Sequence, residues 1–586
     1  MSDKSCNYWC YGDYFPKTKS WNESRDCCSW DGVTCDMLNG HVIGLDLSCS
    51  QLCGSIHPNS SLFQLHHLHT LNLAYNNFNW SSIPHNIGRL RNLRHLNLSY
   101  SFFSGKIPTE ISYLSNLVSL DLSGIQLDER TFETMIHNFT NLELLDLSLG
   151  NISSPIPVKI HPNSSLFQLN HLHTLNLDNN YLYPSSIPNG IGRLRNLRHL
   201  ILSGFDGKIP TEISYLSNLV SLHLSNGYYE KLQLDERTFE AMFQNFTNLE
   251  ILSLSHVNIL SPIPVNISSS SLRYLDLGYT NLRGVLTDSL FLLQNSLETL
   301  KLSGNYLLEG VFPKIHPSNT LLMELDISFT SISGKLPDSI GTFSSLNILN
   351  LKQCQFSGSI PDSIGNLTQI TELLLSSNSF SGEIPDVFSN LQELRTLQLS
   401  YNSFIGSFPA SILSLTHLEY LGLSSNSLSG PLPSNQSMLQ KLTSVDLPYN
   451  SLNGTIPSWV FTLPFLYSVS LQHNRFRGLA DEVIKINPTL KHQHLSNNQL
   501  NGSFPQSLVN LTNLETLGIS SNNITIDEGM NITFLSLSSL FLSSYQLKDF
   551  PHFLTNVKKL VYLDISNNKI RGQIPDWFSG MRWDSL

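Results

Sequence analysis

Apolar residues recur along this chain at a fixed spacing of 24 residues. The first apolar position of the unit recurs in eight equal steps, at Leu322, Leu346, Ile370, Leu394, Leu418, Leu442, Leu466, Leu490 and Leu514. The shared pattern is LxxLxLxxNxLxGxIPxxLxxLxx, and its LxxLxL core is found from Val42 to Ile565. Self-similarity at such a period is the signature of a repeat architecture.

The LxxLxL core predicts one short β-strand in each unit. Its second and third apolar positions are two residues apart, so their side chains point to the same face of a strand. A single unit cannot bury these side chains, whereas stacked units form one continuous core. We therefore expect a solenoid of about 21–22 units, in which parallel strands lie about 4.8 Å apart.

The ninth position of the unit is usually asparagine. It is occupied by Asn305, Asn378, Asn402, Asn426, Asn450, Asn474, Asn498, Asn522 and Asn568. We expect these amides to point inward and to form a ladder that satisfies backbone groups of neighbouring turns. Cys354 occupies the same position, and we interpret it as a buried free thiol with a structural role.

A longer duplication is superimposed on the short period. "IHPNSSLFQL" begins at Ile56 and again at Ile160, and "GKIPTEISYLSNLVSL" begins at Gly105 and at Gly207. The blocks 56–159 and 160–265 are thus a tandem duplication of four units. The copies differ at a few positions, and duplication of whole turns lengthens a solenoid without disturbing its core.

The composition narrows the class of protein. The 586 residues carry a net charge of -11, which argues against nucleic acid as a partner. No run of 18 apolar residues and no apolar signal segment is present.

Seven of the eight cysteines lie within the first 53 residues, which suggests disulfides and an oxidising compartment. Disulfides of a secreted protein are in conflict with a sequence that lacks a signal segment, so we expect that the chain is incomplete. Zinc is disfavoured because the cysteines show no CxxC spacing.

The cysteine-rich segment "SWNESRDCCSWDGVTCD", followed by 24-residue units with GxIP, resembles the plant extracellular leucine-rich repeat family. "DCCSWDGVTC", "LDLSCSQLCG" at Leu45 and "NSSLFQL" at Asn59 resemble receptor-like proteins of the tomato Cf disease-resistance type. The resemblance implies an α/β solenoid, a leucine-rich repeat superhelix with a parallel β-sheet on its concave face. It further implies a cysteine-rich cap over 1–41 and a repeat array over 42–586. In that family a signal peptide precedes the cap, and a C-terminal cap and a membrane helix follow the repeats; we expect this chain to lack these parts.

The cap would cover the first turn of the solenoid, with Trp21 and Trp30 as its packing residues. Trp30 as a ligand contact is the less favoured alternative. Alongside the resemblance we expect the disulfide Cys28–Cys35 and a bond from Cys27 to Cys10 or Cys6, while the pairing of Cys6, Cys49 and Cys53 stays open.

No catalytic motif is present, so we predict neither an enzyme nor a cofactor. Ligands of such solenoids generally use the sheet face, whose exposed positions are the third, fifth, seventh and eighth of each unit. In the regular region the candidate ligand-binding residues are Gln398, Tyr401, Tyr420, Asp446, Tyr449, Gln472, His473, His492 and His494. Tyrosines beside polar groups are good contact anchors. The alternative is a merely solvated surface, and a metal at the histidines is disfavoured.

Sixteen Asn-x-Ser/Thr sequons suggest a glycoprotein. Some belong to the repeat consensus itself. Asn138, Asn245, Asn366 and Asn510, however, all lie four residues before a new unit and form one outer column. We expect glycans at these four positions.

The leading functional hypothesis is the ligand-binding ectodomain of a cell-surface receptor-like protein in plant innate immunity. Its partners would be a microbial or endogenous protein or peptide and a co-receptor kinase with leucine-rich repeats. It would be attached to the outer side of the cell membrane only through a C-terminal segment missing here. The alternative is a secreted inhibitor of microbial cell-wall-degrading enzymes. A glycan-active enzyme is disfavoured, because the sheet face offers no paired carboxylates in register.

Overall fold

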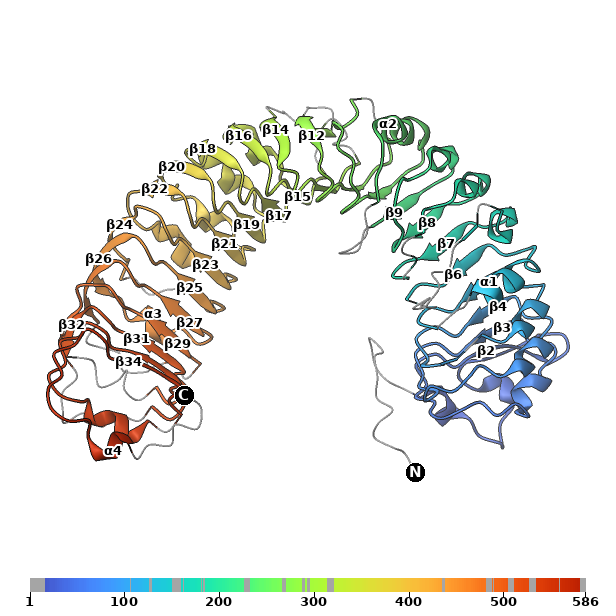
Figure 1. Ribbon diagram of the computed structural model, residues 1–586, viewed down its shortest axis with the longest axis horizontal. Helices are drawn as coiled ribbons and strands as arrows, with labels where there is room; N and C mark the ends of the chain where they lie inside the picture. The colour runs from blue at the N-terminus through green and yellow to red at the C-terminus, as the bar shows by residue number, and fades with distance from the viewer. Residues whose placement is uncertain are drawn as a thin grey trace. The chain divides into compact units, whose positions relative to one another are not determined.

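The computed structural model describes residues 16–105, 107–125, 129–149, 160–161, 163–180, 182, 185–225, 232–265, 270–286, 290–291, 296–313, 321–434, 438–480, 487, 489–503, 511–525, 534–557 and 559–579. The chain forms two compact units, Met1–Gly284 and Val285–Leu586, called unit 1 and unit 2 below. Each unit is a stack of short strands and turns (Figure 1). Among the described residues, no helix is both long and apolar enough to cross a bilayer.

Unit 1 contains one ladder of short strands along the inner edge of its stack (Figure 1). Its strands are β1 (Val33–Cys35), β2 (Val42–Asp46), β3 (Thr70–Asn72), β4 (His95–Asn97), β5 (Ser119–Asp121), β6 (Leu144–Asp146), β7 (Thr174–Leu177), β8 (His199–Leu202), β9 (Ser221–Leu224), β10 (Ile251–Ser253) and β11 (Tyr274–Asp276). From β2 to β11 each strand pairs in parallel with the next one along the chain. β1 pairs antiparallel with β2 and closes that end of the ladder.

Unit 2 repeats this arrangement. Its inner strands are β13 (Thr299–Lys301), β15 (Glu324–Asp326), β17 (Ile348–Asn350), β19 (Glu372–Leu374), β21 (Thr396–Gln398), β23 (Tyr420–Gly422), β25 (Ser444–Asp446), β27 (Ser468–Ser470), β29 (His492–His494), β31 (Thr516–Gly518), β33 (Ser539–Phe541) and β34 (Tyr562–Asp564). All of these pairings are parallel. The parallel solenoid expected from the repeat pattern is confirmed.

The periodic leucines explain both ladders. The central leucine of each strand pairs in register with its counterpart in the next unit, as Leu349 does with Leu373 and Leu373 with Leu397. These three side chains are completely buried. The strand residues on either side of each leucine point to the opposite face and remain partly exposed. The alternation therefore places a dry core on one face and a polar surface on the other.

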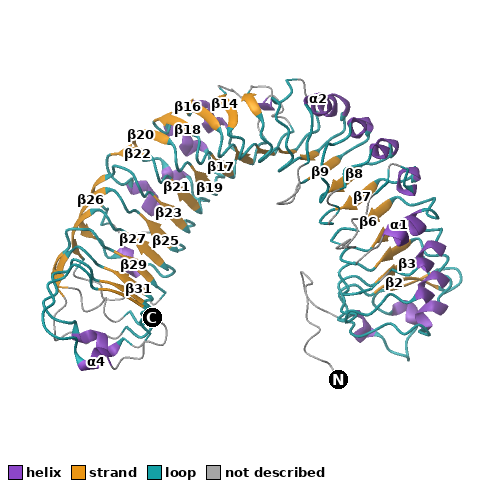
Figure 2. Ribbon diagram, viewed as in Figure 1, coloured by secondary structure: helices purple, strands orange, loops and turns teal. Residues whose placement is uncertain are grey.

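Short helices pack on the outer side of the strands (Figure 2). The 3₁₀ helices are η2 (Lys17–Ser20), η3 (Cys27–Ser29), η4 (Ser61–Gln64), η5 (His85–Arg89), η6 (Thr109–Tyr113), η7 (Ser165–Gln168), η8 (Asn189–Arg193), η9 (Thr211–Tyr215), η11 (Asp338–Thr342), η12 (Asp362–Asn366), η13 (Phe388–Asn390), η14 (Ala410–Ser414) and η16 (His552–Asn556). The α-helices are α1 (Glu129–Ile136), α2 (Glu236–Asn245), α3 (Trp459–Thr462) and α4 (Asp576–Ser579). Most of these 3₁₀ helices directly follow a proline, as η6 and η12 follow the proline of the GxIP motif, and its fixed φ suits a residue just before a helix.

Unit 2 also carries shorter parallel ladders formed by the segment around the repeat glycine. Their strands are β14 (Leu307–Val311), β16 (Ser331–Lys335), β18 (Gln355–Gly358), β20 (Ser379–Glu383), β22 (Ser403–Ile405), β24 (Ser429–Pro431), β26 (Ser451–Ile456), β28 (Arg475–Leu479), β30 (Asn501–Ser503) and β32 (Asn523–Thr525). β12 (Arg283–Val285) contains the boundary between the units. Several glycines in these strands have positive φ, as at Gly358 and Gly382, which explains the choice of glycine at those positions of the motif.

The asparagine ladder expected from the sequence is present. Asn474 donates from Nδ2 to the carbonyls of Leu447 (2.9 Å) and Leu471 (3.1 Å), and its Oδ1 accepts the N–H of Leu452 (3.0 Å). Asn450 and Asn426 make the same bonds one and two turns earlier, respectively. Each amide thus ties its own turn to the preceding one.

Cys354 takes the place of asparagine in this ladder, and it is a free cysteine. Its Sγ lies 3.1 Å from the carbonyl oxygen of Ile327 and 3.4 Å from Oγ1 of Thr330. Burial raises the pKa of the Cys354 thiol, because the thiolate would lose its hydration. The structural interpretation of this residue therefore fits its surroundings.

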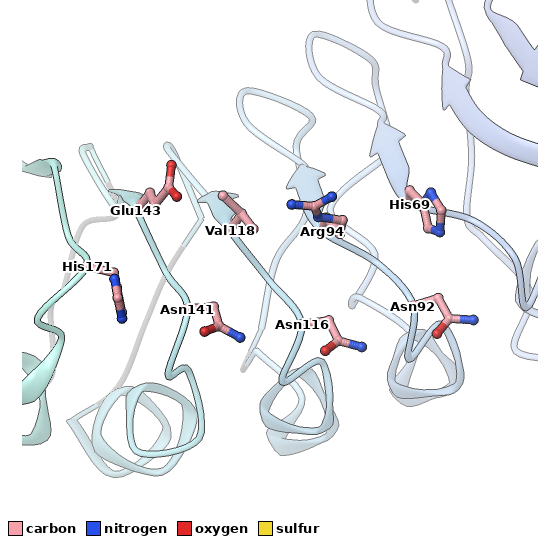
Figure 3. A pocket seen from close by; sticks show the side chains of 8 residues that line it. All are labelled: His69, Asn92, Arg94, Asn116, Val118, Asn141, Glu143 and His171. Carbon is pink, nitrogen blue, oxygen red and sulfur yellow. The ribbon is translucent and has the colours of Figure 1, made fainter.

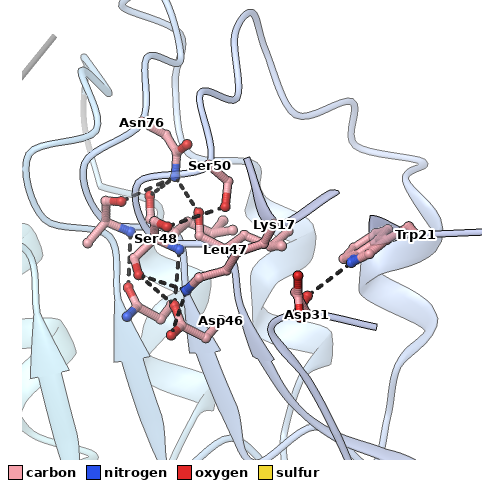
Figure 4. A network of polar contacts seen from close by, with 11 residues as sticks. Lys17, Trp21, Asp31, Asp46, Leu47, Ser48, Ser50 and Asn76 are labelled. Carbon is pink, nitrogen blue, oxygen red and sulfur yellow. Dashed lines mark hydrogen bonds and ion pairs between the residues drawn. The ribbon is translucent and has the colours of Figure 1, made fainter. Parts of the chain in front are cut away.

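The cap at the start of unit 1 is held by aromatic and polar contacts (Figure 4). Trp21 and Trp30 stack with ring centroids 5.0 Å apart, and Trp21 Nε1 donates to the carbonyl of Asp31 (3.0 Å). Lys17 Nζ lies 2.9 Å from a carboxylate oxygen of Asp46 at the end of β2. Burial alone would raise the pKa of Asp46, but hydrogen bonds from Lys17 and a neighbouring serine hold it below its usual value.

The cap cysteines confirm one expectation and correct another. Cys28 and Cys35 form a disulfide. Cys27 is a free cysteine, so the expected disulfide from Cys27 to Cys10 or Cys6 is wrong. Cys27 lies in the turn of η3 beside the existing disulfide, and all three sulfur atoms lie within 4.8 Å of one another. Cys10 and Cys6 lie outside the described residues, and Cys49 and Cys53 are disulfide-bonded.

Candidate ligand-binding site

The residues expected to bind a ligand lie on five neighbouring strands of unit 2, β21 to β29, and on the turns that follow them (Figure 1). We call this surface the inner strip and define it by Gln398, Tyr401, Tyr420, Asp446, Tyr449, Gln472, His473, His492 and His494. The strands are in register, so residues at equal positions of successive repeats form straight columns. The structure brings some of these residues into contact and leaves others apart.

Tyr449 and His473 form the most exposed contact of the inner strip. Their rings stack with centroids 4.3 Å apart and an interplanar angle of 11°. Both residues have positive φ, as does every residue described at this eighth position of the unit 2 repeats from Phe329 to Asn567. His473 Nε2 also lies 3.4 Å from Nδ2 of Asn497 in the next turn. The pair offers a flat aromatic platform with polar edges, which suits a hot spot of binding.

Tyr420 and Asp446 form a half-buried polar pair on β23 and β25. Gly422 leaves the space that the Tyr420 ring occupies, since a Cβ at Gly422 would lie 2.9 Å from that ring. Burial raises the pKa of Tyr420, and the Asp446 charge adds to the effect. Burial also raises the pKa of Asp446, against opposing hydrogen bonds from two serines. A partly desolvated carboxylate beside a phenol favours a ligand that donates a hydrogen bond or carries a cation.

His492 belongs to a network that the sequence did not reveal. Its Nε2 lies 3.0 Å from the Tyr467 hydroxyl, and its Nδ1 lies 3.1 Å from Oγ1 of Thr516. Lys491 Nζ lies over the Tyr467 ring at 5.5 Å and pairs with Glu515 at 2.7 Å. Tyr467, Lys491 and Glu515 occupy the second position of the repeat, which the sequence-based choice of positions left out. The recurrence of polar residues at this position every 24 residues was the available signal.

His494 follows His492 on the same face of β29. Burial lowers the pKa of His494, and the neighbouring His492 lowers it further. Within the described residues, the only group of three or more potential metal ligands close together is Cys27, Cys28 and Cys35. His473, His492 and His494 therefore do not form such a group.

The remaining candidate residues are less connected. Gln472 Oε1 accepts a hydrogen bond from the Ser470 hydroxyl (2.9 Å). Gln398 is partly exposed and Tyr401 is 63% exposed, and within the described residues neither side chain makes a hydrogen bond or a ring contact with another member of the inner strip. The interactions within the inner strip thus lie on β23–β29 and the turns after them, which is the C-terminal part of the range expected from the sequence.

Gln493 lies directly beneath this surface and is fully buried. It occupies the core position of β29, in register with Val469 and Leu517. Among the described residues, neither its Nε2 nor its Oε1 has a hydrogen-bond partner. A buried amide without partners loses its hydration without compensation.

The substitution Gln493→Leu is therefore expected to stabilise unit 2 by about 1–3 kcal/mol, because it removes an unpaired polar group and keeps the volume. Hydrogen exchange of the β27, β29 and β31 amides would measure the gain. The matched reverse change, Leu517→Gln on the next strand, should destabilise the same amides. An unchanged or lower protection in Gln493→Leu would contradict the prediction.

Three of the four proposed glycan acceptors, Asn138, Asn245 and Asn366, are exposed, and Asn510 lies outside the described residues. Asn245 donates from Nδ2 to the carbonyl of Ser214 (3.1 Å), so glycosylation there would replace this bond. The outer column of sequons remains a prediction.

Family models for the leucine rich repeat match residues 368–428 and 464–524, and a related single-repeat model matches 92–114, 171–194, 321–343, 345–367 and 559–581. The leucine rich repeat N-terminal domain matches residues 13–36, over the cap. The chain contains leucine-rich repeats and has their fold. Both the repeat array and the cap of this chain are thus recognised independently of its strand geometry.

Curated relatives of this chain are plant receptor-like proteins. Receptor-like protein 6 of Arabidopsis thaliana is 43% identical over 242 residues, which are 36% of this chain and 24% of the relative. Receptor-like protein Cf-9 of Solanum pimpinellifolium is 37% identical over 257 residues, or 43% of this chain and 26% of the relative. The matches therefore span about a quarter of each relative. The resemblance to Cf-type receptor-like proteins is confirmed.

Two of the solved structures are similar to this chain over nearly its whole length. One is the Arabidopsis receptor kinase HAESA in complex with the peptide hormone IDA and the co-receptor SERK1, with a TM-score of 0.80 and 29% identity over 97% of this chain and 94% of that chain. Another is PEPR1 with AtPEP1, with a TM-score of 0.76 and 26% identity over 98% of this chain and 86% of that chain. The fold of this chain is thus similar to the leucine-rich repeat fold of these two proteins.

Proposed function

We propose that this chain is the ligand-binding ectodomain of a cell-surface receptor-like protein of plant innate immunity. Its ligand is a microbial or endogenous protein or peptide, and it signals through a partner receptor kinase with leucine-rich repeats. The Tyr449–His473 stack carries the proposal, because it exposes a flat aromatic platform at the centre of the inner strip. The half-buried Asp446 on one side and His492 on the other supply polar groups for orientation.

The similar proteins support this function at a coarser level. The relatives are receptor-like proteins, and the HAESA structure contains both a peptide hormone and a co-receptor. Attachment to the outer face of the cell membrane would place the inner strip where secreted peptides reach it. The immune role rests on the similarity to the Cf-type proteins.

A peptide selection tests the proposal. Random 12-residue peptides are selected on the purified chain and counter-selected on the double variant Tyr449→Ala/His473→Ala. The selected peptides are expected to bind the variant at least about 30-fold more weakly, since central aromatic anchors dominate binding energy. The control Tyr215→Ala removes a tyrosine of similar exposure from η9 and should leave affinity unchanged.

A second measurement addresses signalling. A selected peptide should promote association of the chain with the SERK1 ectodomain, and the double variant should lose this response. Failure to obtain any peptide that depends on Tyr449 and His473 would contradict the assignment of the inner strip. Inhibition of a microbial wall-degrading enzyme, without kinase association, would favour a secreted inhibitor instead.

A further inference from the structure

A groove follows the N-terminal ends of strands β3 to β6 in unit 1. It encloses about 420 Å³ and is lined by two rows of side chains (Figure 3). The upper row consists of His69, Arg94, Val118 and Glu143, one from the second position of each successive repeat. Asparagines from the preceding turns form much of the lower row. We call this feature the edge groove.

Backbone hydrogen bonds hold the upper row in place. The carbonyl of His69 accepts the N–H groups of both Arg94 (2.7 Å) and His95 (2.9 Å). The carbonyls of Arg94, Val118 and Glu143 each accept two N–H groups from the following repeat in the same way. The backbone carbonyl of each upper-row residue is therefore fully hydrogen-bonded, and the side chains follow one another at the strand spacing of about 4.8 Å.

The asparagines of the lower row present fixed acceptors. Asn92 donates from Nδ2 to the carbonyl of His66 (2.7 Å), and Asn116 donates to the carbonyl of Arg91 (3.0 Å). These bonds fix which end of each amide faces the backbone. In the described part of the chain, neither Oδ1 receives a hydrogen bond from the protein, so both remain available to N–H groups of a ligand.

The duplicated block supplies a second set of the same groups. The sequence GRLRNLRHL occurs at 88–96 and again at 192–200. The second upper row is His173, Arg198, Val220 and Glu250, again one per repeat. Asn196 and Asn218 also repeat the backbone bonds of the first copy, at 2.6 and 2.9 Å. By contrast, a partly exposed strand position differs between the copies, with His223 of β9 in place of Asp121 at the end of β5.

Each copy carries three arginines within six residues of the chain, called its arginine cluster below, and one of them, Arg94 in the first copy, lines the edge groove. They are Arg89, Arg91 and Arg94 in the first copy and Arg193, Arg195 and Arg198 in the second. All six are exposed, so core packing does not require them. Among the described residues none of the six makes an ion pair, whereas Arg395 of unit 2 pairs with Glu419. Two unpaired basic clusters on a chain of net charge -11 are suited to an anionic ligand.

The two clusters have matching electrostatic surroundings. Burial lowers the pKa of His95, and the adjacent Arg94 lowers it further while Glu143 opposes the shift. Burial, Arg198 and Glu250 act on the pKa of His199 in the same directions. Both histidines are therefore biased toward the neutral form, and the arginines carry the positive charge of each cluster.

A carboxylate separates the clusters. Glu143 lies between them and approaches Nδ1 of His173 at 3.9 Å. The positive charge is thus divided into two patches four strand spacings apart, or about 19 Å. An extended peptide covers this distance in about six residues. A uniformly charged polymer would have to place negative groups against Glu143, which favours a peptide with spaced acidic residues.

We propose that the edge groove and its duplicate bind one extended peptide that carries two acidic segments about six residues apart. Its carboxylates pair with the two arginine clusters, because guanidinium groups bind carboxylates in bidentate fashion. Its backbone N–H groups donate to the amide oxygens of the asparagine rows. The site lies wholly in unit 1 and does not involve Tyr449 or His473, so its failure would leave the function proposed for the inner strip intact.

Two synthetic peptides of equal composition test this inference. The first has 12 residues with two Asp-Asp pairs whose first members are six positions apart, in a Gly/Ser background. The second has the four aspartates in one block. The spaced peptide is expected to bind the purified chain about 10–100-fold more tightly, because both clusters are engaged at once. Fluorescence anisotropy at low and physiological salt measures both affinities.

Arginine variants test whether the tighter binding of the spaced peptide depends on the two arginine clusters. Arg91→Gln/Arg94→Gln, or Arg195→Gln/Arg198→Gln, should abolish the advantage of the spaced peptide, and the quadruple variant should abolish binding. The matched control is Arg475→Gln/Arg477→Gln, which removes two exposed arginines from β28 of unit 2 and should change neither affinity. Circular dichroism spectra identical to the wild type establish that the variants are folded.

Equal affinity for the two peptides would overturn the proposal, as would binding that survives in the quadruple variant. Oligogalacturonate serves as a third probe. If it binds through the same arginines while the spaced peptide does not, the ligand is an acidic polysaccharide and the peptide assignment is wrong.

Discussion

Phe380→Ala is expected to lower the stability of the surrounding repeats by about 3–5 kcal/mol. Phe380 is fully buried between Phe356 and Phe404, with ring centroids 6.0 and 6.2 Å away and nearly parallel planes. The three rings form a spine that joins successive turns of unit 2. Truncation of the middle ring would leave a cavity that two stacked neighbours and a rigid ladder cannot fill.

Phe380→Leu provides the matched comparison. Leu428 and Leu452 occupy the equivalent position of later repeats and are fully buried there, so leucine fits the site. This variant should lose only about 1–1.5 kcal/mol. Hydrogen exchange resolved by strand is the appropriate measurement, since long repeat arrays do not unfold in a single step. Equal losses for the alanine and leucine variants would contradict the cavity argument.

Asn474→Ala is expected to lower local stability by about 2–4 kcal/mol, because it leaves several backbone groups without partners. The residue is 7% exposed, and its amide bridges the carbonyls of Leu447 and Leu471 and the N–H of Leu452. The amide of Leu452 should lose protection first, since Asn474 Oδ1 is its acceptor. Hydrogen exchange at that single amide therefore reports the effect directly.

A graded series sharpens this prediction. Thr330 occupies the ninth position of its own repeat and donates to the carbonyl of Ile327 (2.8 Å), which is one of the bonds that asparagine makes. Asn474→Thr should accordingly cost less than Asn474→Ala. The exposed Asn390 in η13 is the control, and Asn390→Ala should have little effect. An alanine variant at Asn474 that is as stable as this control would show that the ladder contributes no net free energy.

Much of the candidate site could be located from the sequence, because columns in a parallel ladder follow directly from the repeat period. Tyr449 and His473 are one turn apart at the same position, and their stacking follows from the strand spacing. The partner of His492 could not be located in this way. Tyr467 reaches it from the second position of the preceding repeat, and that contact depends on side-chain directions rather than on spacing.

For the cap cysteines too, the sequence predicted one contact correctly and another wrongly. Cys28 and Cys35 flank a short turn and bond to each other, as expected. Cys27 is adjacent to Cys28 in the chain, yet it is a free cysteine. Spacing in the sequence restricts which cysteines can meet, but the direction of each Cβ in the folded cap decides which of them bond.

The sequence by itself determined the stacked parallel strands and the asparagine ladder of this protein, because both arise from interactions between identical positions of neighbouring repeats. A 24-residue period brings such positions together whatever the rest of the chain does. The tertiary structure alone decided three other features: the ladders around the repeat glycines of unit 2, the lack of a partner for the buried Gln493 among the described residues, and the edge groove along β3–β6. These depend on side-chain directions and on contacts between different positions of adjacent turns, which the period does not specify.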